Sequence, residues 1–173
     1  MKDRMLFNTC PESEFFGRVS EIEYIYRRAT EERKPAPSIF LSAKRWMGKT
    51  EVLRRVYHNL FWGQARVVPV YYQFKGYGSL EDFSEDFLKE VLKQYLAFRK
   101  REPRLVTNEI SIDKLEKLLV DNDLYDMADL ISLHKEAKKG GDLVAALRNA
   151  LSAPQNLTLR SGIPVYLILD DVD

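Results

Sequence analysis

The chain has 173 residues, of which 45% are hydrophobic, and its 27 basic side chains against 26 acidic ones give a formal net charge of +1. This composition supports one domain with a real core, so it excludes a disordered chain, and the balanced charge gives no reason to expect a general binder of polyanions. A single cysteine, Cys10, excludes an internal disulfide, which suits a reducing compartment. The N-terminus lacks the apolar core of a signal peptide, and no apolar run approaches the roughly 20 residues that span a bilayer. We therefore expect a soluble, cytoplasmic protein without a membrane partner.

The first third of the chain predicts a helix, a strand and a second helix, in that order. Ser20 can cap a helix with one apolar face, and the segment KPAPS, residues 34–38, breaks it. Residues 38–43, SIFLSA, are short, apolar and β-prone, which predicts a buried strand. From Thr50 the apolar residues recur at helical spacing, and Gly63 marks the end of that helix. The apolar face of the first helix consists of Ile22, Ile25, Tyr26 and Ala29.

The middle of the chain predicts another strand and a long helix. Residues 65–74, ARVVPVYYQF, are rich in Val and Tyr, which favours a strand. Ser79 and Asp82 resemble a capping box at the start of a helix that Pro103 ends. This helix begins acidic and ends in basic residues, an order that suits the helix dipole.

The last part of the chain predicts helices and then a strand with an acidic end. Residues 104–141 contain no clear strand and predict two short amphipathic helices, SIDKLEKLLV and DLYDMADLISLHKEAKK, which we interpret as an insertion within the domain. Asp142 can cap a further helix over residues 142–152, and Val165–Leu169 is a strongly apolar strand. Strands that alternate with helices indicate an α/β fold, a parallel sheet flanked by helices, in a single domain over residues 1–173.

Residues 43–50 read A-K-R-W-M-G-K-T at the junction of an expected strand and helix, close to the phosphate-binding pattern G-x-x-x-x-G-K-[ST]. In such a loop, inward-pointing backbone N–H groups and the positive end of the following helix hold phosphate. Gly48 lets the chain pass close to the phosphates, and Lys49 reaches the β and γ phosphates. The Thr50 hydroxyl binds Mg²⁺. Ala43 stands where the first Gly belongs, and its methyl group costs little in a β or bridge conformation but about 1–2 kcal/mol if φ must be positive.

The other loop residues have more than one interpretation. Lys44 and Arg45 raise the positive potential at the rim of the loop, and Arg45 either touches a phosphate or is solvated there. Trp46 and Met47 either cover the nucleotide or pack against the loop. The expected nucleotide contacts of this segment are Ala43, Lys44, Arg45, Trp46, Met47, Gly48, Lys49, Thr50 and Glu51.

The second requirement of nucleotide chemistry is an acidic group at the end of a neighbouring apolar strand. Asp170 and Asp171 follow the strand Val165–Leu169 directly. The first acid of such a pair holds Mg²⁺, and the second polarises an attacking water. We therefore expect Thr50 and Asp170 as metal ligands, and Asp171 and Lys49 as catalytic groups. The alternative is a sheet edge with a solubilising acidic turn.

Three segments, FFGRVSEIEYI, AKRWMGKTEVL and GIPVYLILDDVD, resemble the ATPase domain of the archaeal-type and STAND ATPases. These are signal-transduction P-loop ATPases related to the AAA+ and origin-recognition class. The resemblance implies a P-loop NTPase core of the ASCE type with ATP and Mg²⁺ as cofactors. It also implies that Phe16, Gly17 and Arg18, in a G-R-x-x-E segment that ends at Glu21, help to form the adenine pocket. The family loop usually reads G-P-x-R-x-G-K-[ST], so this chain departs from it at residues 43–44.

The family layout also predicts what this sequence lacks. A strand with a polar sensor residue normally follows the acidic strand and lies between it and the loop strand. Because the sequence stops at Asp173, we expect an incomplete core, truncated after the acidic (Walker B) strand, that turns over ATP poorly. The expected partners are the nucleotide and the C-terminal domains of the same protein, with a homo-oligomer left open.

Four functions compete at this point. The first is an ATP-binding switch that hydrolyses ATP in its full-length form. The second is a nucleotide-sensing scaffold with little or no hydrolysis, which Ala43 and Asp171 favour mildly. The third is an origin-recognition-like ATPase associated with nucleic acid, which needs a DNA-binding module that the sequence does not display. The fourth is a structural helical module on a loop that has lost its ligand.

Overall fold

The computed structural model describes residues 6, 7, 10, 15, 17–31, 38–44 and 47–172, and these form seven helices and two strands. In chain order the elements are α1 (Val19–Thr30), α2 (Lys49–Gly63), β1 (Val68–Gln73), α3 (Leu80–Lys100), α4 (Arg104–Thr107), α5 (Ile112–Val120), α6 (Tyr125–Lys139), α7 (Leu143–Ser161) and β2 (Val165–Asp170). The chain is therefore a mixed α/β protein, as the alternation of apolar periods predicts. None of the helices among these residues combines the length and the apolarity that crossing a membrane requires.

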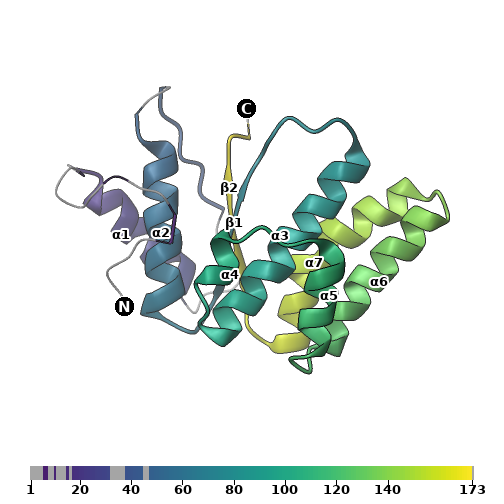
Figure 1. Ribbon diagram of the computed structural model, residues 1–173. Coiled ribbons are helices and arrows are strands. Elements are labelled where there is room, and N and C mark those ends of the chain that lie inside the picture. Colours follow the sequence, from purple (N-terminus) through teal and green to yellow (C-terminus); the bar gives the residue numbers. More distant parts are fainter. Residues whose placement is uncertain are drawn as a thin grey trace.

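The sheet is a parallel pair that lies between two layers of helices. β1 and β2 pair in register from Val68 opposite Val165 to Gln73 opposite Asp170. Figure 1 shows α2 on one side of the sheet, with α1 packed against α2, and α3 and α7 on the other side. α5 and α6 form a further layer beyond α3 and α7, and one hydrophobic core runs from α1 through the sheet to α6.

The outer edge of β1 is closed by a side chain. The N–H of Val68 donates to the Pro164 carbonyl oxygen at 2.8 Å. The backbone groups of alternate residues of β1 therefore bond to β2, and the backbone groups of the residues between them point away from β2, to the outer edge of the sheet. Pro69 points outward and has no N–H to leave unpaired. Tyr71 is the next outward residue, and Gln94 of α3 accepts its N–H and donates to its carbonyl oxygen, both at 2.8 Å. β1 is thus built as a terminal strand.

The opposite edge of the sheet, along β2, is open among the described residues. The Val165 N–H donates to Thr158 Oγ1 at 3.1 Å. The backbone groups of Leu167 and Leu169 face away from β1, and no described residue bonds to them there. The parallel pair therefore has one closed edge and one edge that can accept a further strand.

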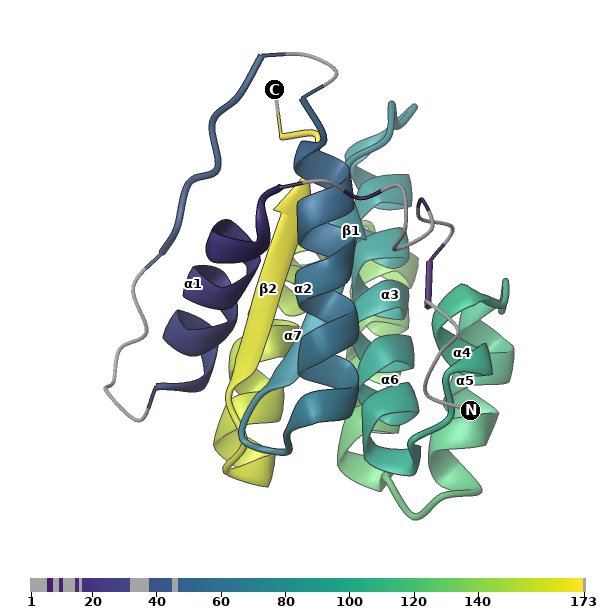
Figure 2. The same cartoon turned by 90° about the vertical axis from the view of Figure 1, so that its left-hand side faces the viewer.

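The predicted strand over residues 38–43 is wrong. Residues 38–44 form no strand, and the Phe40 side chain is 94% exposed. Figure 2 shows this segment as a loop that rises to α2 apart from β2. A strand forms only where a partner backbone accepts its hydrogen bonds, and no described residue lies in that position.

The predicted helices are confirmed, with two changes at their ends. α1 begins at Val19 with Arg18 as its N-cap, so Ser20 lies inside the helix and does not cap it. α7 does not end near residue 152, because it continues through Pro154 to Ser161. Pro154 is buried on the face of α7 that joins the core, and this burial offsets the hydrogen bond that its missing N–H cannot make. Gly162, at φ 70°, ends the helix.

The helix caps expected at Ser79 and Asp142 are present. Ser79 Oγ accepts the Asp82 N–H at 3.0 Å at the start of α3. Asp142 accepts the Ala145 N–H at 2.9 Å at the start of α7. Residues 104–141 hold no strand, and they contain the two predicted helices, α5 and α6, together with the short α4, which was not predicted.

Candidate functional site

The N-terminal end of α2 presents backbone donors with no partner in the helix. Gly48 is the N-cap, at φ 75° and ψ 22°, and a Cβ added there would meet nothing within 4 Å. The first helical bond runs from the Val52 N–H to the Gly48 carbonyl oxygen at 3.1 Å. The N–H groups of Lys49, Thr50 and Glu51 precede that bond and are left for an anion or for water. The helix dipole adds positive potential at the same place.

The loop before α2 is tied to the segment before α1. The Met47 N–H donates to the Lys44 carbonyl oxygen at 3.3 Å, which makes a turn in the loop. The Arg18 guanidinium donates to the Met47 carbonyl oxygen at 3.4 Å, so Gly17 and Arg18 lie beside the loop that the sequence assigned to phosphate. Ala43 is not among the residues with positive φ, and its methyl group therefore causes no backbone strain. Of the other expected contacts, Phe16, Arg45 and Trp46 lie outside the described residues.

The acidic end of β2 lies at the same end of the molecule as the start of α2. Figures 1 and 2 both show the C-terminal end of β2 close to the end at which α2 begins. Asp170 is 4% exposed, whereas Asp171 is exposed and adopts the left-handed conformation at φ 54°. Lys49 and Thr50 are half-buried, and no carboxylate among the described residues pairs with the Lys49 ammonium. The fold thus places the expected metal ligands and the expected phosphate-binding lysine at one end of the sheet.

The buried carboxylate of Asp170 has a hydrogen-bond partner that the sequence did not reveal. The Tyr71 hydroxyl donates to Asp170 Oδ2 at 2.7 Å, and the Arg54 Nε–H donates to the Tyr71 hydroxyl oxygen at 3.4 Å. Burial raises the pKa of Tyr71, and the hydrogen bond to Asp170 raises the pKa further. Tyr71 is therefore a neutral donor at physiological pH.

Two of the predicted site residues have side chains engaged elsewhere. The Glu51 carboxylate accepts hydrogen bonds from Arg55 Nε at 2.8 Å and from the Cys10 N–H at 3.4 Å. Of Glu51, only the backbone N–H is therefore left to contact an anion at the N-terminal end of α2. The Asp171 carboxylate accepts a hydrogen bond from Gln73 Nε2 at 2.6 Å, so Gln73 competes with water for this group.

The donor set suits a magnesium ion held mainly by phosphate and water. The described residues contain no group of three or more His, Cys, Asp or Glu side chains that could hold a metal ion by themselves. Mg²⁺ is usually bound through one or two protein oxygens, and substrate phosphates and waters complete its coordination. Thr50 and Asp170 can provide the protein oxygens. These residues therefore fit Mg²⁺ as part of a nucleotide complex and not as a free-standing metal site.

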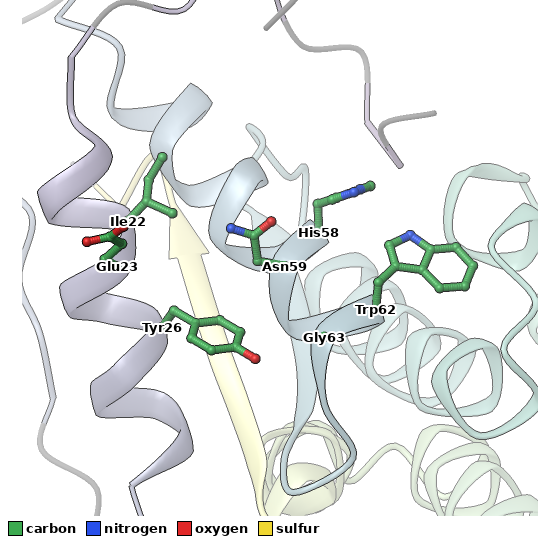
Figure 3. Close-up of a pocket in the computed structure, with 7 residues that line it drawn as sticks. All are labelled: Ile22, Glu23, Tyr26, His58, Asn59, Trp62 and Gly63. Carbon is green, nitrogen blue, oxygen red and sulfur yellow. The ribbon is translucent and has the colours of Figure 1, made fainter. Parts of the chain in front are cut away.

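A pocket of about 460 Å³ lies away from this end, between α1 and α2. None of the residues expected to contact the nucleotide lines it. Figure 3 shows the Tyr26 ring pointing from α1 across to α2 and the Trp62 ring pointing away from α1. The Tyr26 hydroxyl lies so close to Gly63 that a Cβ on Gly63 would come within 2.9 Å of it. The lining residues are Ile22, Glu23, Tyr26, His58, Asn59, Trp62 and Gly63.

Comparison with known proteins gives no match to a protein-family model, to a curated protein or to a solved structure. The interpretation of the site therefore depends on its residues and their geometry.

Proposed function

We propose that the chain is an ATP-binding P-loop module of the ASCE type, which holds Mg²⁺–ATP at the N-terminal end of α2. In this proposal, hydrolysis of ATP drives a conformational switch in the full-length protein. The supporting observation is that Gly48, in the left-handed conformation, starts α2 at the end of the sheet where the buried Asp170 ends β2. ATP rather than GTP is favoured by the family resemblance of the sequence.

Each residue of the site has a defined part in this proposal. The N–H groups at the start of α2 donate hydrogen bonds to the phosphates, and the Lys49 ammonium, which has no carboxylate partner among the described residues, neutralises their charge. Thr50 and Asp170 orient the metal, which would neutralise further phosphate charge. The contact of Arg18 with the Met47 carbonyl oxygen brings the expected adenine-binding segment to the loop.

Nucleotide binding is tested by equilibrium titration of the chain with a fluorescent ATP analogue and Mg²⁺. Lys49→Ala removes a charged contact worth about 1.5–3 kcal/mol, so we expect affinity to fall by at least about tenfold. Lys117→Ala, at an exposed position of α5, is the matched control and should bind as the unaltered chain does. Equal affinity of the Lys49→Ala and Lys117→Ala chains, or no binding by the unaltered chain, would contradict the proposal.

One observation favours a second candidate function, a nucleotide sensor with little or no hydrolysis. A water-activating carboxylate must be free to accept a proton from water, but Asp171 already accepts a hydrogen bond from Gln73. Asp171→Asn, introduced into the full-length protein, distinguishes the two functions in a phosphate-release assay. Loss of turnover with unchanged nucleotide affinity supports the ATPase, whereas unchanged release of phosphate supports the sensor.

A further inference from the structure

Tyr71 and Asp170 lie on the same face of the sheet, next to α2. Tyr71 is opposite Ile168 in the parallel register, and Asp170 is two residues further along β2. Because side chains alternate along a strand, both point to one face. The contact of Arg54 with Tyr71 identifies this face as the one that α2 covers.

The Tyr71 hydroxyl is held in place from three directions. Gln94 fixes the backbone of Tyr71 through two hydrogen bonds of 2.8 Å, and both residues are buried. The Arg54 guanidinium lies 5.8 Å from the centre of the Tyr71 ring and donates to its hydroxyl oxygen. The hydroxyl proton is thereby directed to Asp170 Oδ2, at 2.7 Å.

This contact leaves the two carboxylate oxygens of Asp170 unequal. Oδ2 accepts the Tyr71 hydroxyl, whereas Oδ1 accepts no hydrogen bond from any described residue. A carboxylate anchored through one oxygen presents the other in a fixed direction, which reduces the reorganisation needed when a ligand arrives. Arg54 is four residues after Thr50, so their side chains lie on one face of α2, and Tyr71 contacts the turn of the helix just beyond Thr50.

We propose that Tyr71 is a positioning residue for Asp170, and that it directs Oδ1 toward a magnesium ion or a magnesium-bound water beside Thr50. This inference rests on the proposed function and deepens it. Tyr71 itself contacts neither nucleotide nor metal. Its loss should therefore weaken the dependence of nucleotide binding on Mg²⁺ and leave the metal-free contacts of the phosphates unchanged.

The test compares the unaltered chain with Tyr71→Phe and with Tyr166→Phe, which changes a half-buried tyrosine of β2 whose hydroxyl makes no hydrogen bond with any described residue. Affinity for the fluorescent ATP analogue is measured in EDTA and then at increasing free Mg²⁺. We expect equal affinity of all three chains in EDTA. Loss of a hydrogen-bond partner of a metal ligand commonly reduces metal affinity tenfold or more, so the Mg²⁺ concentration at half-effect should rise by about tenfold in Tyr71→Phe alone. A purely structural role of Tyr71 does not predict this separation.

The outcomes separate this inference from the function on which it rests. No binding by the unaltered chain overturns both. Enhancement by Mg²⁺ that is the same in the unaltered chain and in Tyr71→Phe overturns the role of Tyr71 alone. Because Tyr71→Phe can impair folding, Tyr71→3-fluorotyrosine, which keeps the hydroxyl, provides a second measurement. Its ¹⁹F resonance should shift on addition of Mg²⁺ to the nucleotide-bound chain, and an unchanged resonance overturns the proposed coupling.

Discussion

Replacement of Gln94 by methionine should destabilise the sheet at the point that fixes Tyr71. Gln94 is 1% exposed and makes two hydrogen bonds of 2.8 Å to the Tyr71 backbone, and its Nε2 also donates to Glu90 Oε2 at 3.2 Å. Methionine has a similar length and volume, so the packing between α3 and β1 is retained while the two hydrogen bonds to Tyr71 are lost.

The expected size of the effect follows from the two backbone groups that lose their partners. Tyr71 is 6% exposed, so its N–H and carbonyl have little access to water. A buried polar group without a partner costs about 1–3 kcal/mol. We expect the free energy of unfolding to fall by about 2–6 kcal/mol, a large part of the roughly 5–15 kcal/mol that a domain of this size has.

Urea titration followed by far-ultraviolet circular dichroism measures this loss. Gln155→Met is the matched control, because Gln155 lies exposed on α7 and its replacement should change stability by less than about 0.5 kcal/mol. If Gln94→Met is as stable as Gln155→Met, Gln94 does not close the edge of β1, and the reasoning about Tyr71 loses its support.

Two further predictions concern a buried histidine and the loop glycine. His134 is fully buried, and burial lowers its pKa below the ordinary value of 6.5, so the unfolded chain takes up its proton first as the pH falls. The stability that the neutral His134 contributes is present above pH 6.5 and is lost below it, by at most about 1.4 kcal/mol per pH unit. Urea titrations above and below pH 6.5 should show that the free energy of unfolding changes less with pH in His134→Leu than in the unaltered chain. An equal change in the two chains would contradict this prediction. Gly48→Ala should lower the stability measured by thermal unfolding by about 1–2 kcal/mol, because the left-handed conformation strains an alanine. Gly76→Ala is the control, since Gly76 has no positive φ and has open space around it, and this variant should keep its stability. Equal stability of the two variants would show that Gly48 is not held in the left-handed conformation.

The helices could be predicted because their signals are local. The apolar spacing after Thr50 defines α2, and the Ser79 and Asp142 caps mark the starts of α3 and α7 within a few residues of the groups they bond. The course of α7 through Pro154 escaped prediction because burial of that residue depends on tertiary packing, which the local rule against proline does not include.

The sheet was only partly predictable because pairing depends on residues far apart in the chain. Residues 38–43 have the composition of a strand, but composition does not supply the partner that a strand needs. The Tyr71–Asp170 hydrogen bond joins residues 99 positions apart, and the hydrogen bonds from Gln94 to the Tyr71 backbone join residues 23 positions apart. Both require the register of β1 against β2, which no motif in the sequence specifies.

The most direct test of the nucleotide site is a crystal structure of the chain with a non-hydrolysable ATP analogue and Mn²⁺ in place of Mg²⁺. The anomalous signal of Mn²⁺ identifies the metal without reference to the protein chain. We expect the peak between the Thr50 hydroxyl and the Asp170 carboxylate, with the phosphates against the N–H groups at the start of α2. A manganese peak elsewhere, or an analogue bound away from the Gly48–Thr50 turn, would contradict the assignment of this end of the sheet as a nucleotide site.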